Sequence, residues 1–432
     1  MRTVSKTVIG VDFGTQSARA VLVNAENGEI IYSCRKEYPY NSTPVPAIDC
    51  AENLPCATDY EMTLYELLRN VIPEEYRKTV AGICVDATSL TMVLLAEDGR
   101  ALSELDGWSE AAHARVKLWK YHRAQEKADE ALNLARNLQE PFLGRTGGSI
   151  SCEWMLPKLL EVRDEAPEIY SKIDLAMDLC EFLTFRLTGQ LVRSIGSLSY
   201  KCLWAEDLSF PERTFLNGLR AGFYEEYCHF LRGDVRKPGE CAGMLRSELT
   251  KRWGLPEQIP VATGMLDGHT SLATMGAFEP GDAALIVGTS NVCTVQDRKL
   301  QELKDVCGVA QDGMVTGSCG IDTGQSSTGN MLGWFVEHMA GWQIHREAEE
   351  RKISPHQVLA ERIQKPWENK VIAVDWWSGS RNAPCDLTLR GSMSGLEMDT
   401  KTEDIYLALL QAIACGTGTI LESLSGQGVE IG

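Results

Sequence analysis

Two short turns, each containing a Gly-Thr pair, are the first features of this chain that could bind a charged ligand. Gly14-Thr15 follows one apolar, β-branched stretch and Gly288-Thr289 follows another. Glycine at such a turn permits positive φ angles, so that successive backbone N–H groups can point into one anion-binding concavity. Thr15 and Gln16 could add side-chain donors to phosphate oxygens. Each turn alone would serve equally well as an ordinary hairpin turn, and the first is no Walker A loop because no Gly-Lys-Ser/Thr follows it.

Two aspartates could carry the chemistry that such a phosphate site needs. Asp12 ends the stretch before the first turn, where its carboxylate could hold Mg²⁺ through water. Asp267 follows the apolar stretch 259–263 and begins a predicted helix rich in small residues. There it could accept a proton from a sugar hydroxyl during phosphoryl transfer, or it could simply cap the helix. The two roles are compatible, because a helix N-terminus also favours a negative charge.

The charge balance restricts the partners of the chain. Its 432 residues carry a formal net charge of −18, which argues against binding nucleic acid. A phosphate ligand would therefore need a local positive field from backbone N–H groups, a metal or a few basic residues. Lys201, which follows Tyr200, is one candidate, although a solvated salt bridge is the ordinary role of a lysine in so acidic a chain.

The composition is that of a globular protein, with 44% hydrophobic and 24% charged residues. The N-terminus shows no signal-peptide core, and no apolar run approaches the ~20 residues that span a bilayer. The fourteen cysteines are scattered without a Cys-x-x-Cys pair, which is typical of reduced thiols in a cytosolic protein. We therefore expect a cytoplasmic protein that contacts neither membrane nor nucleic acid, and for which a homodimer is one open arrangement.

Apolar, β-branched stretches joined by turns predict the sheets that must position these residues. Asn27-Gly28 is a strong hairpin signal, and strands are expected around it at 7–12, 18–24 and 29–35. A similar pattern recurs at 82–102 and at 282–297. Since the Gly-Thr pair occurs in two distant parts of the chain, it suggests two related lobes that face one ligand.

Apolar residues at helical spacing predict helices between these strands, at 111–138, 153–162, 176–187 and 406–424. Strands and helices mixed in this order predict an α/β fold. The length exceeds what one ordinary core supports. We therefore expect two lobes, at residues 1–270 and 271–432, with a break near Pro280-Gly281.

These motifs, in this order, resemble the FGGY carbohydrate kinases and, within that family, the ribulokinases. The stretch from Val11 to Arg19 looks like the first phosphate motif of the family, and Gly288-Thr289-Ser290 looks like the second. The stretch 85–92 is similar to the ribulokinase substrate loop. Further matching stretches run along essentially the whole chain, at 113–122, 147–158, 187–189, 199–201, 324–326, 375–381 and 389–396.

The resemblance implies a two-lobed, actin-like ATPase fold with a ribonuclease-H-like core in each lobe, and with sugar and ATP in the cleft between the lobes. It implies an enzyme that phosphorylates a ketopentose with MgATP, foremost L-ribulose to L-ribulose 5-phosphate, with Asp267 as the general base and Asp12 as the Mg²⁺ ligand. The implied sugar contacts are Ser89, Lys201, Asp267 and Asp322. The implied contacts of the ATP phosphates are Gly14, Thr15, Gln16, Ser17, Arg19, Gly288, Thr289, Ser290 and Gln325.

The chain departs from the ribulokinase pattern at the predicted sugar site. Asp322 stands where glutamate is usual and Ser89 where alanine is usual, and the shorter Asp322 reaches less far by about one C–C bond. A kinase for another ketose or polyol, such as D-ribulose or xylulose, therefore remains an alternative. The glycine-rich adenine-binding segment of the family would follow Gly432, so we expect an incomplete second lobe, and a truncated sugar-binding pseudokinase with little activity is a further alternative.

Overall fold

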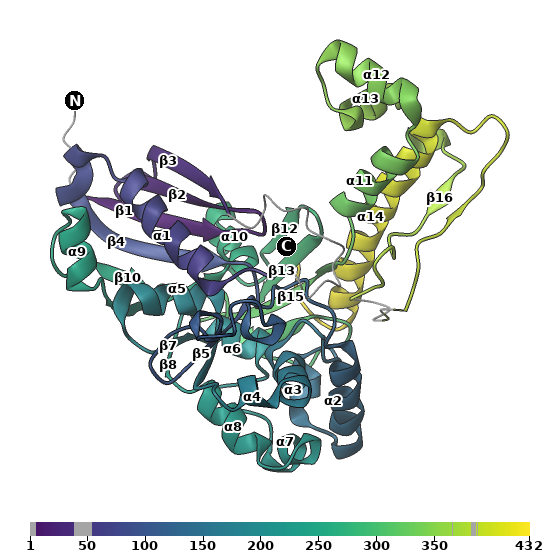
Figure 1. The fold of residues 1–432 in the computed structure, drawn as a ribbon. Helices are drawn as coiled ribbons and strands as arrows, with labels where there is room; N and C mark the ends of the chain where they lie inside the picture. The colour runs from purple at the N-terminus through teal and green to yellow at the C-terminus, as the bar shows by residue number, and fades with distance from the viewer. Residues whose placement is uncertain (1–5, 39–53, 365, 382–385, 387) are drawn as a thin grey trace. The chain divides into compact units, whose positions relative to one another are not determined.

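The computed structural model describes residues 6–38, 54–364, 366–381, 386 and 388–432 of the chain (Figure 1). The chain divides into two compact units. The first comprises residues 1–143, 149–274 and 310–319, and the second comprises residues 144–148, 275–309 and 320–432. Each unit contains a β-sheet with helices packed against it.

A seven-stranded mixed sheet forms the centre of the first unit (Figure 1). The strands follow the order β3-β2-β1-β4-β10-β9, and β11 also pairs with β4. The first three strands are antiparallel, whereas β1, β4, β10 and β11 run parallel. Their bounds are β1 Thr7–Phe13, β2 Ser17–Asn24, β3 Ile30–Glu37, β4 Val80–Ala87, β9 Cys241–Met244, β10 Pro260–Ala262 and β11 Met265–Leu266.

The three N-terminal strands confirm the prediction from the sequence. Ile9, Val11 and Phe13 alternate along β1 with less buried residues, which is the period of two that a strand with one face in the core requires. The pattern predicted at 82–102 is confirmed as β4, a turn at 88–90, the apolar strand β5 and a turn at Asp98-Gly99. The second strand, β5 (Met92–Leu95), is not part of the central sheet and pairs instead with β6 (Leu175–Asp178).

Two helices cover the core face of this sheet. In α1 (Ala57–Val71), the buried residues Tyr60, Leu64 and Leu68 recur every four positions and pack on the sheet. The second helix, α5 (Leu179–Thr188), is capped by Asp178, whose carboxylate accepts from the backbone N–H of Leu179. Both helices contribute to one apolar cluster with β1, β2 and β4.

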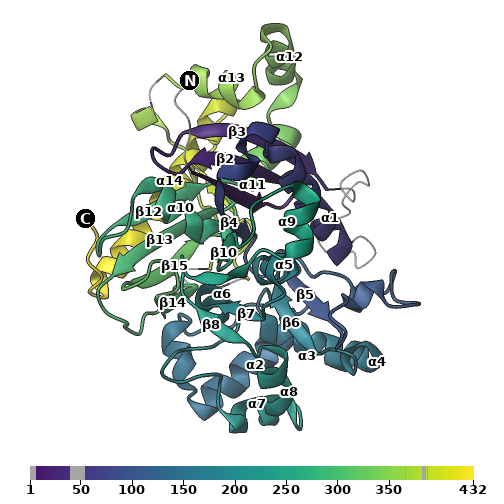
Figure 2. The ribbon, with the colours of Figure 1, turned by 90° about the vertical axis from the view of Figure 1, so that its left-hand side faces the viewer.

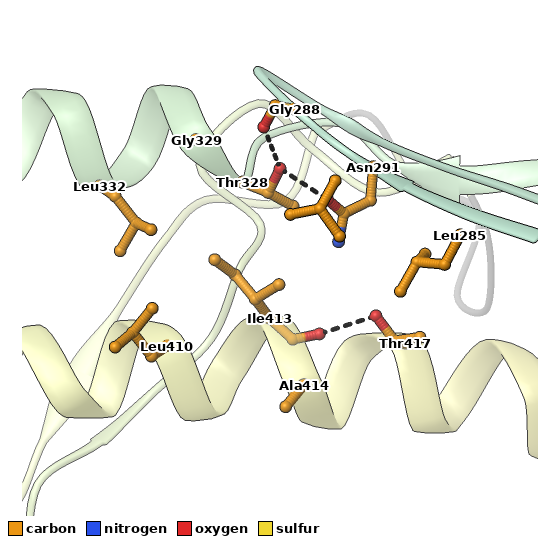
Figure 3. Close-up of a pocket in the computed structure, with 11 residues that line it drawn as sticks. Leu285, Gly288, Asn291, Thr328, Gly329, Leu332, Leu410, Ile413, Ala414 and Thr417 are labelled. Atoms are coloured by element: carbon orange, nitrogen blue, oxygen red, sulfur yellow. Dashed lines mark hydrogen bonds between the residues drawn. The ribbon is translucent and has the colours of Figure 1, made fainter. Parts of the chain in front are cut away.

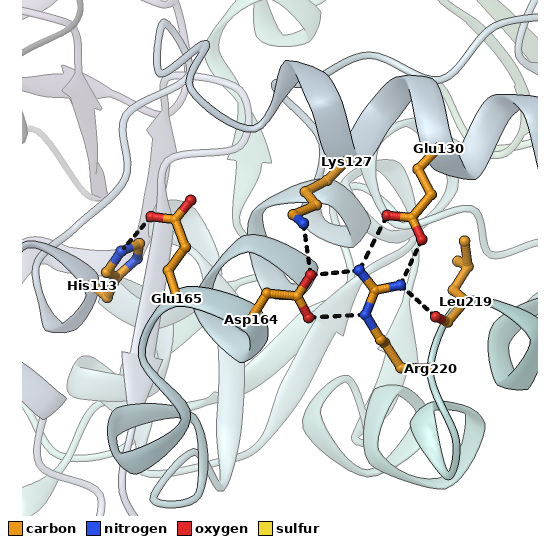
Figure 4. A network of polar contacts seen from close by, with 7 residues as sticks. All are labelled: His113, Lys127, Glu130, Asp164, Glu165, Leu219 and Arg220. Carbon is orange, nitrogen blue, oxygen red and sulfur yellow. Dashed lines mark hydrogen bonds and ion pairs between the residues drawn. The ribbon is translucent and has the colours of Figure 1, made fainter.

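A helical layer follows β5 and has its own apolar core. Arg220 joins its helices in a network of ion pairs (Figure 4). The Arg220 Nε donates to Asp164 at 2.9 Å, and Lys127 donates to the same carboxylate at 2.6 Å. The elements of this layer and their neighbours are α2 Gln125–Leu138, α3 Met155–Glu165, α4 Pro167–Tyr170, α6 Ile195–Lys201, α7 Arg213–Leu219, α8 Phe223–Phe230, α9 Ser247–Trp253, β7 Val192–Ser194 and β8 Asp234–Arg236.

The second unit contains a four-stranded sheet with the order β12-β13-β15-β14 (Figure 2). Its first two strands form an antiparallel hairpin that closes at Gly288-Thr289-Ser290, as predicted at 282–297. The bounds are β12 Ala283–Val287, β13 Asn291–Asp297, β14 Gly308–Gln311 and β15 Cys319–Gln325. Two further short strands, β16 Ile372–Ala373 and β17 Met393–Ser394, pair with each other.

The long helix α14 (Thr402–Gly426) joins the two apolar clusters of the second unit. Tyr406 and Leu409 pack with helices α11 to α13, whereas Ile420 and Leu424 pack with the sheet. By length and composition alone, α14 is long and apolar enough to cross a membrane, with a mean hydropathy of 1.4 over its best window. The other helices here are α11 Gly329–His338, α12 Gly341–Arg351 and α13 Pro355–Arg362.

Two of the four predicted helices differ from the structure. The stretch 111–138 is helical from Gln125 onward and at a short 3-10 turn at Ala112–Ala114. The remainder of 111–124 is irregular: local turns bond several of its carbonyl groups, and those of Lys117 and Leu118 accept from Lys158. The stretch predicted at 176–187 begins as strand β6 before α5 starts, since Asp178 caps the helix at this point.

Candidate active site

Three aspartates gather at the carboxyl ends of neighbouring parallel strands in the first unit. Asp12 of β1 and Asp86 of β4 are directly opposite each other in the strand register. Leu266 of β11 is opposite Ala87, so that Asp267 follows at the same edge. Parallel strands end at one edge of a sheet, where the loops after them line the usual binding site of α/β proteins. The sheet topology therefore brings together the two aspartates that we predicted for Mg²⁺ and for base catalysis.

Asp86 completes this group and was absent from the predicted site residues. The pKa of its carboxyl is raised to about 8, firstly by burial and then by the negative charges of Asp12 and Asp267. Asp86 also hydrogen-bonds to Asp12 and to Thr270 of α10 (Asp267–Met275). The signal was present in the sequence, since Asp86 repeats the Val-Asp that precedes the first turn, but only the pairing of β1 with β4 makes the two residues neighbours.

The side chains of these aspartates can be compared with the ligands that Mg²⁺ prefers. In the described part of the chain, no set of three or more His, Cys, Asp and Glu side chains forms a ready cage for a metal. Mg²⁺ does not require one, because it usually keeps several waters and binds one or two carboxylates together with the phosphates of a nucleotide. Burial and then the negative charges of Asp12 and Asp267 raise the pKa of Asp86, so a cation bound here would relieve their repulsion. Asp12 and Asp86 therefore fit a cation that arrives with its nucleotide.

The start of α10 fixes the orientation of Asp267. The backbone N–H of Gly268 donates to Asp267 Oδ1 at 2.7 Å, and Thr270 Oγ1 donates to the Asp267 carbonyl at 2.7 Å. The aspartate thus belongs to the helix N-terminus, as predicted, and its side chain is half-buried. A base in this position is held rigidly, which general base catalysis requires.

Lys201 lies at the end of α6, next to the start of α10. Its neighbour Tyr200 packs edge to face on the buried His269, with ring centroids 4.7 Å apart. This contact explains His269 as a packed histidine. It also brings the end of the helix that carries Lys201 beside the helix that Asp267 begins, so that both predicted sugar-binding residues lie in one region of the first unit.

The first Gly-Thr turn connects β1 to β2 and is held from three sides. Tyr38 donates its hydroxyl to the Gly14 carbonyl at 2.9 Å, and Trp119 Nε1 donates to Thr15 Oγ1 at 3.1 Å. Arg35 Nε donates to Ser17 Oγ at 3.0 Å. Gln16 and Arg19, the other two predicted phosphate contacts here, are exposed.

Arg19 is directly opposite Asp12 in the register of β1 and β2. Side chains at such positions share one face of the sheet. The guanidinium therefore belongs to the same edge as the carboxylates and supplies positive charge next to them. Arg19 is thus a basic residue of the kind that a phosphate ligand would need in so acidic a chain.

The second Gly-Thr turn is fixed to the start of α11 in the second unit. The backbone N–H groups of Gly329 and Asn330 donate to the carbonyls of Gly288 and Thr289 at 3.0 and 3.2 Å. Gly288 and Thr289 are exposed and Ser290 is half-buried. A Cβ atom on Gly329 would lie 2.5 Å from the Gly288 carbonyl oxygen, so glycine is required for this close approach.

Gln325 supports this turn through a buried network. Its amide accepts from Asn291 at 2.9 Å and from Thr417 at 2.8 Å, and it donates to Asp375 at 2.6 Å and to the Ile413 carbonyl at 2.9 Å. Through these hydrogen bonds, the amide of Gln325 connects β13, β15 and α14. A direct contact of Gln325 with ATP stays a prediction. A contact of Asp322, a buried residue of β15, with the sugar also stays a prediction.

An apolar cavity of about 410 Å³ opens beside the second turn (Figure 3). Leu332 of α11 faces it from one side, and Leu410 and Ile413 of α14 face it from the other. Thr328 Oγ1 closes one end by donating to the Gly288 carbonyl at 3.0 Å. An aliphatic cavity beside the exposed Gly288-Thr289 turn suits a ligand with an apolar ring and a polar end.

A two-unit α/β protein with carboxylates at the strand ends and two Gly-Thr turns defines a class, the carbohydrate kinases of the actin-like ATPase fold. Family models confirm this assignment. Residues 7–274 match the N-terminal domain of the FGGY family of carbohydrate kinases, and residues 283–432 match its C-terminal domain. The chain belongs to the FGGY family and is a sugar kinase, for which ATP is a substrate. The predicted family and fold class are confirmed.

Named relatives lie within the same family. The chain is 34% identical over 437 residues to the ribulokinase of Halalkalibacterium halodurans, covering 99% of this chain and 78% of that protein. It is 36% identical over 442 residues to the ribulokinase of Mycolicibacterium smegmatis, covering 99% of this chain and 77% of that protein. The ligand-bound xylulose kinase from Lactobacillus acidophilus has the same fold, with a TM-score of 0.76 at 18% identity, covering 97% of this chain and 78% of that chain.

Proposed function

We propose that this kinase transfers the γ-phosphoryl group of MgATP to the terminal hydroxyl of a ketopentose, foremost L-ribulose. The observation that carries the proposal is the group of Asp12, Asp86 and Asp267 at one sheet edge, with Asp267 fixed at the start of α10. The similarity to ribulokinases over nearly the whole chain supports the choice of sugar. In the proposal, residues 1–270 bind the sugar and residues 271–432 supply the second phosphate turn.

In this mechanism Asp267 orients the terminal hydroxyl of the sugar and accepts its proton as the oxygen attacks the γ-phosphorus. The bond from that phosphorus to the bridging oxygen breaks, and ADP leaves. Asp12, together with Asp86, would hold the Mg²⁺ of the nucleotide, which neutralises the developing charge on the phosphates. The N–H groups of the two Gly-Thr turns bind phosphate oxygens, while Ser89, Lys201 and Asp322 bind the sugar hydroxyls.

The shorter Asp322 favours a second candidate, a kinase for a different ketose or polyol. One carboxylate that reaches less far changes which hydroxyl it can bind. A panel of L-ribulose, D-ribulose, xylulose and simple polyols, assayed by coupled ADP release, separates the two candidates. The sugar with the highest kcat/KM identifies the substrate.

Asp267→Asn tests the catalytic assignment. Loss of a general base should lower turnover by ~10²–10⁴-fold, while sugar affinity measured by calorimetry stays near that of the parent. Asp59→Asn is a matched control, because Asp59 also lies in the first turn of a helix and accepts a backbone N–H, from Cys56. Wild-type turnover in the Asp267 variant would refute the assignment. Sugar binding without turnover in the parent would instead identify a sugar-binding protein without kinase activity.

A further inference from the structure

The loop between β4 and β5 holds a leucine in an unfavourable backbone conformation. Leu90 has φ of 46°, in the left-handed region that a leucine rarely adopts. Its side chain is only 1% exposed and packs in the core of the helical layer. Ser89, a predicted sugar contact, immediately precedes it. Within the described part of the chain, the buried Ser89 hydroxyl has no hydrogen-bond partner, which is rare for a buried polar atom.

Two buried charged groups hold the peptide groups of Leu90 from opposite sides. Lys158 Nζ donates to the Leu90 carbonyl at 2.9 Å, and the Leu90 N–H donates to Asp178 Oδ2 at 3.1 Å. Both side chains are fully buried. Asp178 is itself fixed by Ser197, which donates to the same carboxylate oxygen at 2.8 Å.

Lys158 also reaches a second loop. Its Nζ donates to the Leu118 carbonyl at 2.9 Å. The next residue, Trp119, donates its indole N–H to Thr15 of the first phosphate turn at 3.1 Å. One ammonium group thus connects the predicted sugar loop with the segment that supports the phosphate turn.

This arrangement is unusual for a buried cation. Among the residues that the structure describes, the other fully buried cations, Lys117 and Arg193, each form an ion pair with a buried glutamate. The described ion pairs include none with Lys158, whose hydrogen bonds all go to backbone carbonyls. Burial accordingly lowers the pKa of Lys158 to about 7. Burying a cation without an ion pair costs free energy of folding. What Lys158 contributes in return is the backbone geometry that its hydrogen bonds impose on the two loops.

We propose that Lys158 is a positioning residue for sugar phosphorylation, which holds Leu90 in its left-handed conformation so that Ser89 faces the sugar. The inference rests on the proposed function, because the roles of Ser89 and Thr15 come from it. Lys158 itself is buried and acts only through the two loops.

Lys158→Met tests the proposal, because methionine keeps an unbranched apolar chain but cannot bond to the carbonyls. Two observables are needed. Amide hydrogen exchange should increase in peptides that cover 88–91 and 117–120 and stay unchanged elsewhere. Ketopentose affinity, measured by calorimetry, should fall by about tenfold or more, as expected for the loss of charge-assisted hydrogen bonds, with ATP affinity less affected. Arg193→Met is a control for the loss of an equally buried cation, because Arg193 also donates to carbonyls, at Ala176 and Phe230, but it additionally leaves Glu181 unpaired.

A second variant distinguishes positioning from simple loss of stability. Glycine adopts positive φ without a side-chain penalty, so adding Leu90→Gly to Lys158→Met should recover part of the lost sugar affinity, although it removes a packed side chain and lowers the unfolding temperature. Recovery of affinity despite lower stability supports positioning. No recovery, or equal losses in Lys158→Met and Arg193→Met, would overturn it.

The proposed function can fail separately. If the parent binds no ketopentose in the panel, the substrate assignment is wrong. Hydrogen exchange then decides whether Lys158 holds the two loops: increased exchange confined to 88–91 and 117–120 supports that role, and unchanged exchange refutes it.

Discussion

Replacing Asp86 with asparagine should stabilise the ligand-free protein. Burial, followed by the charges of Asp12 and Asp267, raises the pKa of Asp86 from 3.8 to about 8. At pH 7 the folded protein therefore keeps this carboxyl protonated, whereas the unfolded chain ionises it. One pKa unit corresponds to about 1.36 kcal/mol, so the ~3 units between 3.8 and pH 7 set a ceiling of ~4 kcal/mol on the cost to folding.

The sign of the pH dependence follows from the direction of this shift. Because the folded state binds more protons than the unfolded state between about pH 4 and pH 8, the stability of the parent falls as pH rises through that window. Asparagine cannot ionise but can still donate to Asp12, so the variant avoids this loss. We expect equal stabilities near pH 4 and a gain of ~1–2 kcal/mol for Asp86→Asn at pH 7, below the ceiling because solvent and neighbouring groups relax.

Urea unfolding in metal-free buffer at pH 5, 6 and 7 measures this gain. Asp164→Asn is the control, for which the stability should change in the opposite direction (Figure 4). Hydrogen bonds from Arg220 and then from Lys127 lower the pKa of Asp164 to about 2, so both states are ionised throughout this range and the variant should lose stability by a similar amount at each pH. Added Mg²⁺ should reduce the advantage of Asp86→Asn. Unchanged or lower stability of Asp86→Asn at pH 7 would refute the claim that burial and the neighbouring carboxylates keep Asp86 protonated.

Three further predictions concern the sugar residues and the second turn. Lys201→Met should weaken ketopentose binding more than ATP binding in separate titrations, and equal losses would return Lys201 to a salt-bridge role. Asp322→Glu should raise the ratio of kcat/KM for L-ribulose to that for xylulose, and an unchanged ratio would place the residue outside the sugar site. In α11, Gly329→Ala should lower stability by ~1–3 kcal/mol, because its Cβ would lie 2.5 Å from the Gly288 carbonyl oxygen. Gly333→Ala in the same helix should instead raise stability by ~0.5–1 kcal/mol, because its Cβ would meet nothing within 4 Å. Equal effects of the two variants in thermal unfolding would contradict the close contact at Gly329.

Local patterns in the sequence determined the strands and turns. The alternation in 7–12 and the Asn27-Gly28 turn predicted the first hairpins, because strand alternation and turn geometry depend on neighbouring residues. The hairpin at Gly288-Thr289 followed in the same way. The resemblance of these motifs to the FGGY kinases identified the family, which the domain matches confirm.

Only the tertiary structure brought distant residues together. Asp86 joins Asp12 and Asp267 because β1, β4 and β11 are parallel neighbours, and the strand order of a sheet cannot be read from local periodicity. The stretch 111–124 has helical spacing but is largely irregular, and the carbonyl groups of Lys117 and Leu118 accept from a side chain far away in the sequence. That side chain is Lys158, which ends the matching stretch 147–158 but was not among the predicted site residues. Its role depends on long-range hydrogen bonds to two loops, which exist only once the chain has folded.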